Sequence, residues 1–119
     1  MLYFNFSGHP ANLPENSEPM AAPFVGINLE MSDPGRVVET IREVLLSLPD
    51  RGRLLAGAKA TIILPGMSPA AGIFLAEWHG QFGNFPAIRW SIRTDAGFVF
   101  TQDTVADLAE VRDSARTAR

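Results

Sequence analysis

The segment TIILPGMSPAAGIFLAEWHG, residues 61–80, constrains the fold more than any other part of the chain. It opens with a short, β-branched apolar run without alternation, which is typical of a strand covered on both faces. The run stops at Pro65 and Gly66, and apolar residues then recur at the three- to four-residue spacing of a helix. We therefore expect a central, parallel strand, a turn and a helix in direct succession.

The predicted helix has a start signal and a stop signal. Ser68 is placed as the N-cap, with Pro69 as the first helical residue, and Gly83 follows the last apolar position. The helix is therefore expected to expose the N–H groups of its first turn just beyond the strand. The apolar residues at helical spacing are Met67, Ala70, Ala71, Phe74, Leu75, Trp78 and Phe82.

Strands and helices are predicted to alternate along the rest of the chain. A polar loop with four prolines, residues 8–23, follows the first strand, and a glycine-containing connector covers 51–59. A turn at Asp95-Ala96-Gly97 is expected to join two strands as a hairpin. The remaining predicted strands cover 2–7, 24–32, 87–94 and 97–102, and the remaining predicted helices cover 32–50, with Pro34 in the first turn, and 104–119, with Thr104 as part of a capping motif.

This alternation predicts an α/β fold: one domain over residues 1–119, with a mostly parallel central sheet flanked by helices. A chain of 119 residues with 46% hydrophobic and 19% charged residues has the composition of one domain with its own core.

Composition also excludes several classes of function. A net charge of −3 argues against a general DNA-binding protein. The chain has no cysteine, and His9 and His79 lie far apart, so we expect no metal and no cofactor. No run approaches the roughly 18 apolar residues of a membrane span, and the N-terminal LYFNF is unlike a secretion signal. We expect a cytoplasmic protein that does not bind membranes.

In open α/β sheets, ligands bind beyond the carboxyl ends of the strands. The turn at Pro65–Ser68 leads into a helix N-terminus, which favours an anion such as phosphate. There Gly66 permits close approach and Ser68 adds a hydroxyl; the alternative is that Ser68 acts only as a cap. The turn lacks both the P-loop and the G-x-G-x-x-G patterns, so nucleoside triphosphates and dinucleotide cofactors are not indicated.

Two further segments carry candidate residues. The segment NFSGHP ends the first strand and is expected to deliver Asn5, Ser7 and His9 to the same edge of the sheet; the alternative is a plain turn. In EWHGQFGNFP, His79 and Asn84 are expected to line the end of the helix. A Ser/His/acid triad is not indicated, because the chain has no nucleophile-elbow motif.

Three blocks of the sequence together resemble a known family. NFS and HP near the N-terminus, the central ILPGMSPAAGIFLAEWHGQFGNFPAI and the C-terminal LAEVRDSAR are similar to small accessory proteins of type III CRISPR systems, the Csx-type family numbered fifteen. The chain departs from that pattern at Gly8, which separates Ser7 from His9. The resemblance implies a Rossmann-like domain related to the CRISPR-associated Rossmann (CARF) sensors, a homodimer or larger homo-oligomer, and a cyclic oligoadenylate ligand, cyclic tetra-adenylate in particular.

We expect the protein to bind and sequester cyclic tetra-adenylate and thereby to damp the antiviral response. One alternative is a metal-independent ring nuclease that cleaves this ligand, with His79 as the candidate catalytic residue; the other is a small α/β interaction protein without a nucleotide ligand. Phe82 or Phe85 is the candidate for base stacking. The candidate ligand-binding residues are Asn5, Ser7, His9, Gly66, Met67, Ser68, Phe82 and Asn84.

Overall fold

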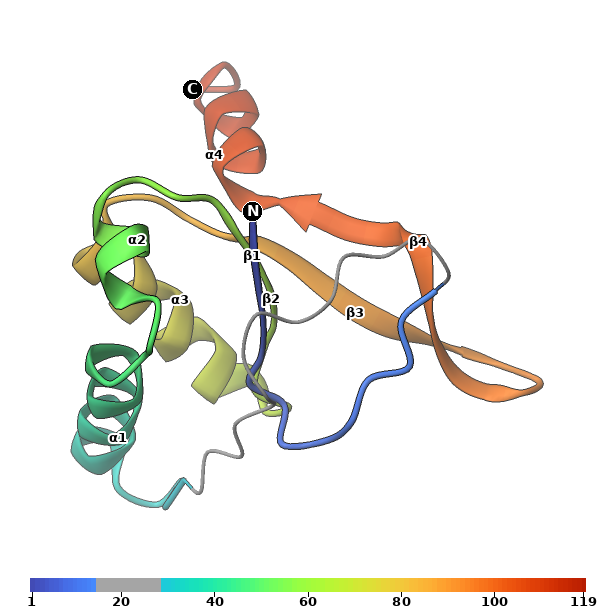
Figure 1. The fold of residues 1–119 in the computed structure, drawn as a ribbon, viewed down its shortest axis with the longest axis horizontal. Coiled ribbons are helices and arrows are strands. Elements are labelled where there is room, and N and C mark those ends of the chain that lie inside the picture. Colours follow the sequence, from blue (N-terminus) through green and yellow to red (C-terminus); the bar gives the residue numbers. More distant parts are fainter. Residues whose placement is uncertain (15–28) are drawn as a thin grey trace.

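The sheet is built around β2 (Ala60–Ile63). In the computed structural model, which describes residues 1–14 and 29–119, β2 lies between β1 (Leu2–Asn5) and β3 (Ala87–Thr94) and runs parallel to both (Figure 1). All four residues of β2 are buried. The prediction of a central, parallel strand in this segment is confirmed.

The fourth strand, β4 (Gly97–Asp107), pairs antiparallel with β3, so the strand order is β1-β2-β3-β4. The predicted hairpin through Asp95 and Ala96 is confirmed, with Thr94 paired to Gly97. The result is an open, mostly parallel sheet in a mixed α/β fold.

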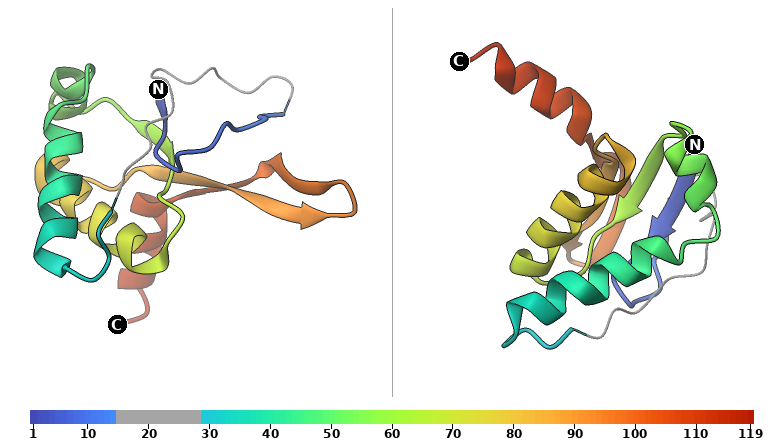
Figure 2. Two further views of the ribbon diagram at one scale, coloured as in Figure 1. Left: turned by 90° about the horizontal axis from the view of Figure 1, so that it is seen from below. Right: turned by 90° about the vertical axis from the view of Figure 1, so that its left-hand side faces the viewer.

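The helices are α1 (Pro34–Leu46), α2 (Arg51–Leu55), α3 (Ser68–Phe82) and α4 (Leu108–Arg116). Both α1 and α3 contribute to the core cluster that also contains β1 and β2 side chains, so they pack on the same face of the sheet (Figure 2). This follows from the strand order, because successive crossovers of the same hand that move in one direction place their helices on one face.

Four aromatic rings join β1 to α3. Phe4 and Phe6 project from the N-terminal segment, and Phe74 and Trp78 project from one side of α3; all four are at most 3% exposed. The ring centroids of Phe6 and Phe74 lie 4.7 Å apart, and those of Phe4 and Trp78 lie 6.3 Å apart. Contacts of this kind stabilise beyond the burial of area alone, so α3 is held firmly along β1.

The N-cap of α3 is displaced by one residue from the predicted position. Met67 has the extended backbone of a cap (φ −106°, ψ 133°), whereas Ser68 is already helical, and the α3 cap makes no side-chain hydrogen bond. The prediction of Ser68 as N-cap is therefore wrong. Gly83 ends the helix as predicted, with the positive φ of 77° that glycine adopts without strain.

Three other predicted boundaries also differ. Residues 29–32 of the predicted second strand lead into a turn, in which the Asp33 N–H donates to the Glu30 carbonyl (3.1 Å), and residues 24–28 lie outside the described part of the chain. The short helix α2 occupies the predicted connector. The last helix is capped by Asp107, whose Oδ1 accepts from the N–H groups of Ala109 and Glu110, rather than by Thr104, which lies within β4 and is hydrogen-bonded to Thr101.

The hairpin extends beyond the rest of the sheet. The pairing of β3 with β2 stops at Ile88, and residues 89–105, here called the β arm, continue as two strands (Figures 1 and 2). Between the pairs Arg89–Val105 and Ser91–Phe100, β3 has only Trp90 whereas β4 has 101–104. Such a bulge bends the strand that carries it.

One ion pair connects the two helices on the same face of the sheet. Arg42 of α1 donates from Nε and Nη2 to Oε1 of Glu77 on α3, at 2.9 and 2.6 Å. The hydrogen bonds from Arg42 lower the pKa of Glu77 below its ordinary value of 4.5. Glu77 is thus a structural residue of the α1–α3 contact.

This ion pair predicts a pH dependence of stability. Because the folded-state pKa of Glu77 is lowered, its contribution is present above pH 4.5 and is lost as the pH falls through the folded-state value. In urea unfolding from about pH 6 to about pH 3, we expect the free energy of unfolding to fall more in the wild type than in Arg42→Gln. Arg36→Gln, which removes the same charge from α1, is the control; equal pH dependence in all three proteins would contradict the assignment.

Candidate functional site

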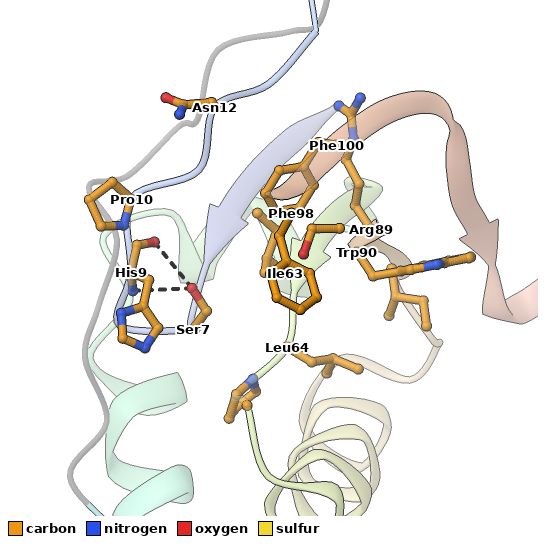
Figure 3. Close-up of a pocket in the computed structure, with 14 residues that line it drawn as sticks. Ser7, His9, Pro10, Asn12, Ile63, Leu64, Arg89, Trp90, Phe98 and Phe100 are labelled. Carbon is orange, nitrogen blue, oxygen red and sulfur yellow. Dashed lines mark hydrogen bonds between the residues drawn. The ribbon is translucent and has the colours of Figure 1, made fainter. Parts of the chain in front are cut away.

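Two loops and the β arm meet at the edge of the sheet where β1 and β2 end. The pocket between them encloses about 760 Å³ (Figure 3). Its walls are the loop after β1, the turn between β2 and α3, and the base and inner face of the β arm. This is the position at which open parallel sheets bind ligands.

The loop after β1 is held in shape by Asn5. Its Oδ1 accepts from the backbone N–H of Ser7 (3.0 Å) and from the Ser7 hydroxyl (2.6 Å), and its Nδ2 donates to the carbonyl of His9 (2.7 Å). Asn5 is 3% exposed and does not line the pocket, whereas Ser7 and His9 do. Asn5 therefore holds the loop in place without facing the pocket. Ser7 and His9 are the residues of this loop that can contact a ligand.

Gly8 makes this loop possible. Its φ is 79°, in the left-handed region that residues with a side chain adopt only under strain. The resulting turn lets the Ser7 hydroxyl interact with both the N–H and the carbonyl of His9 (Figure 3). Gly8, between Ser7 and His9, thus has a structural role.

The second wall is the turn between β2 and α3. It contributes Ile63, Leu64, Pro65 and Gly66 to the pocket. Gly66 is exposed and has no other group within 4 Å of the place where a Cβ would lie, so a ligand can approach its backbone closely. Met67 and Ser68 follow at the exposed start of α3, adjacent to the pocket but not among its lining residues.

The third wall comes from the β arm, which sequence reasoning did not single out. Arg89 is 8% exposed, and its Nη2 donates to the carbonyl of Thr101 (3.1 Å), across the bulge. Trp90, Phe98 and Phe100 add aromatic surface, and Phe98 is 72% exposed. The sequence did contain a signal for this wall. Phe98 and Phe100 alternate along the predicted strand 97–102, and the strand predicted to pair with it, 87–94, carries Arg89 and Arg93.

The remaining candidates lie at the other end of α3. His79 packs against Phe85 with ring centroids 4.5 Å apart, Phe82 packs against Trp78 at 4.8 Å, and the Asn84 Oδ1 accepts from the Phe85 N–H. Because α3 spans Ser68–Phe82, this end is about 20 Å from the pocket. The predicted site residues therefore divide into two groups: Asn5, Ser7, His9, Gly66, Met67 and Ser68 at the carboxyl edge, and His79, Phe82 and Asn84 far from it.

The electrostatic character of the pocket differs from that of the chain. The net charge is −3, yet among the described residues that line the pocket there is a buried arginine, Arg89, and no carboxylate. Hydroxyl groups of Ser7 and Ser91, the side-chain amide of Asn12 and the imidazole of His9 also belong to its polar lining. Such a lining favours an anionic ligand with apolar, flat parts.

Within residues 1–14 and 29–119, no group of three or more histidine or acidic side chains is placed to hold a metal ion. In the same part of the chain, each helix is too short or too polar to cross a lipid bilayer.

Comparison of the chain with protein-family models, curated proteins and solved structures found no significant match.

The hydrogen bonds of Asn5 predict a loss of local order when they are removed. Asn5→Ala deletes the acceptor for Ser7 and the donor for His9, and we expect the free energy of unfolding to fall by about 1–3 kcal/mol. The amide hydrogen of Ser7 is expected to exchange faster with solvent. Asn12→Ala, at an exposed asparagine, is the control; unchanged exchange at Ser7 in Asn5→Ala would show that Asn5 does not hold the loop.

Proposed function

We propose that the pocket at the carboxyl edge binds cyclic tetra-adenylate and that the protein sequesters this second messenger, damping type III CRISPR signalling. The observation that carries the proposal is the combination, in one pocket, of Arg89, the Ser7 and Gly66 loops and the aromatic side chains of the β arm. The resemblance of three sequence blocks to the CRISPR accessory family supports the choice of ligand. The finer assignment of the fold as CARF-like is part of the same proposal.

Each part of the ligand has a complementary group in the pocket. Phosphates are matched by the Arg89 guanidinium, the Ser7 hydroxyl and the nearby start of α3, whose first N–H groups lack partners within the helix. Adenine bases are matched by the aromatic rings. A carboxylate in the lining would repel the phosphates, and none of the described lining residues carries one.

The size of the pocket favours a homodimer. Pockets of about 300–1,000 Å³ hold one drug-sized ligand, and a cavity of about 760 Å³ therefore suits part of a ring of four nucleotides. Two subunits related by a twofold axis would each hold half of a symmetric ring. The proposal thus includes one ring for every two subunits.

Sequestration is favoured over cleavage by the chemistry of the lining. Ser7, Ser91, Asn12 and the backbone of Gly66 are neutral hydrogen-bonding groups, and His9 is the one described lining residue with an imidazole, the group that most often serves as a general acid or base. Groups that bind the ground state and the transition state equally tighten binding without accelerating a reaction. His79, the candidate catalytic residue from the sequence, lies at the far end of α3.

A charge placed at Gly66 tests the site. Gly66→Asp brings a carboxylate to the pocket wall, and we expect the affinity for cyclic tetra-adenylate to fall about tenfold or more, equivalent to ~1.4 kcal/mol or more. The fold should tolerate the change, because the position has free space and an acidic group near a helix N-terminus is favourable.

Gly80→Asp is the matched control, because it adds the same charge near the far end of α3, where there is also free space. Calorimetric titration would measure the affinities of the wild type, Gly66→Asp and Gly80→Asp for cyclic tri-, tetra- and hexa-adenylate. Equal losses in both variants would mean that net charge, and not the pocket, governs binding.

The fate of the ligand distinguishes sequestration from cleavage. After incubation with excess cyclic tetra-adenylate and denaturation of the protein, we expect chromatography to recover intact ring, and mass measurement before denaturation to give one ring per two subunits. His79→Ala should change neither result. Multiple turnovers to linear products ending in a 2′,3′-cyclic phosphate, abolished in His9→Ala, would instead establish a ring nuclease with His9 as its catalytic residue.

A further inference from the structure

The inner face of the β arm carries two aromatic rings at alternate positions of one strand. Phe98 and Phe100 both line the pocket, and Figure 3 shows them across the cavity from His9 and Ser7. Alternate residues of a strand point to the same face and lie about 7 Å apart. Phe98 is 72% exposed, which is unusual for a phenylalanine, and Phe100 is half-buried.

Each ring has a polar partner directly opposite on β3. Phe98 pairs with Arg93, and Phe100 pairs with Ser91. Side chains at directly opposite positions of an antiparallel pair share a face, with their Cβ atoms about 5 Å apart. The inner face of the arm is therefore a repeat of two units, each made of one aromatic ring and one hydrogen-bond donor.

This repeat matches the chemistry of successive nucleotides. Sheets that bind single-stranded RNA stack bases on aromatic side chains and leave cations and hydroxyl groups to contact the phosphates and sugars. We infer that the β arm is the base-recognition element of the pocket: Phe98 and Phe100 each stack one base, while Arg93 and Ser91 contact the backbone that joins them. The inference rests on the proposed function and specifies that the ligand offers unpaired bases in sequence.

The assignment replaces Phe82 and Phe85 as candidates for base stacking. Phe82 is packed against Trp78, and Phe85 contacts both the His79 ring and the guanidinium of Arg112, which is 5.8 Å from its ring centre. Both rings therefore already have partners, whereas most of the Phe98 side chain faces solvent.

The test is a substitution of the more exposed ring. Phe98→Ala should weaken binding of cyclic tetra-adenylate about 10- to 100-fold, the effect of losing one base stack, whereas Phe98→Trp should restore it. Ile92→Ala is the matched control, because Ile92 is an exposed apolar residue, 38% accessible, on the opposite face of the same arm. Trp90 lines the pocket and Trp78 is buried, so quenching of the exposed tryptophan reports binding directly.

A linear tetra-adenylate serves as a further probe. If cyclic tetra-adenylate binds the wild type and Phe98→Ala equally, the arm does not stack bases, and the proposed function stands without it. If the cyclic ligand does not bind the wild type but the linear one does, with the same dependence on Phe98, the arm is confirmed and the proposed function is wrong. If neither adenylate binds the wild type, the inference is overturned together with the proposed function. If Phe98→Ala lowers the molecular mass of the assembly without lowering the affinity per subunit, Phe98 packs against a second copy of the chain and the inference alone is overturned.

Discussion

The packing of four aromatic rings between β1 and α3 is the contact on which the rest of the structure depends. Phe6 lies against Phe74, and Phe4 lies against Trp78, so the N-terminal segment and α3 are fixed to each other along about one turn of the helix. The parallel pairing of β1 with β2, in which Asn5 lies opposite Ile63, brings the loop after β1 beside the β2–α3 turn, and the aromatic contact fixes α3 against β1 just beyond that turn. Ser7 and Gly66 line the same pocket for that reason.

The β arm completes the pocket through a different constraint. The bulge at 101–104 allows β4 to bend, and the buried Arg89 is hydrogen-bonded to the Thr101 carbonyl at that bend. Without this bend the arm would follow the regular twist of the sheet, and Phe98 and Phe100 would lie elsewhere relative to the pocket. Arg89 therefore has two roles in this interpretation: it stabilises the bend, and it brings positive charge to a pocket in a chain with a net charge of −3.

Local patterns predicted much of the fold and part of the site. The strand, turn and helix around Pro65 and Gly66 were predictable because β-branched runs, Pro-Gly breaks and helical spacing each act over a few residues. The N-cap of α3 was missed by one residue, since Met67 and Ser68 are both compatible with the pattern and only the backbone angles distinguish them. The helix α2 was missed because a five-residue helix has too little periodicity to detect.

The sequence by itself determined the order of the main elements and the polar character of the two loops, because both depend on neighbouring residues. The sequence also predicted that the loop after the first strand and the Gly66 turn meet at one edge, but only the tertiary structure decided which candidates lie outside that site. Asn5, Ser7, His9 and Gly66 meet because parallel strands end at one edge, whereas His79, Phe82 and Asn84 are kept away by the length of α3. The aromatic wall was likewise decided in three dimensions, since the direction of the β arm depends on hydrogen bonds across a bulge between residues distant in sequence.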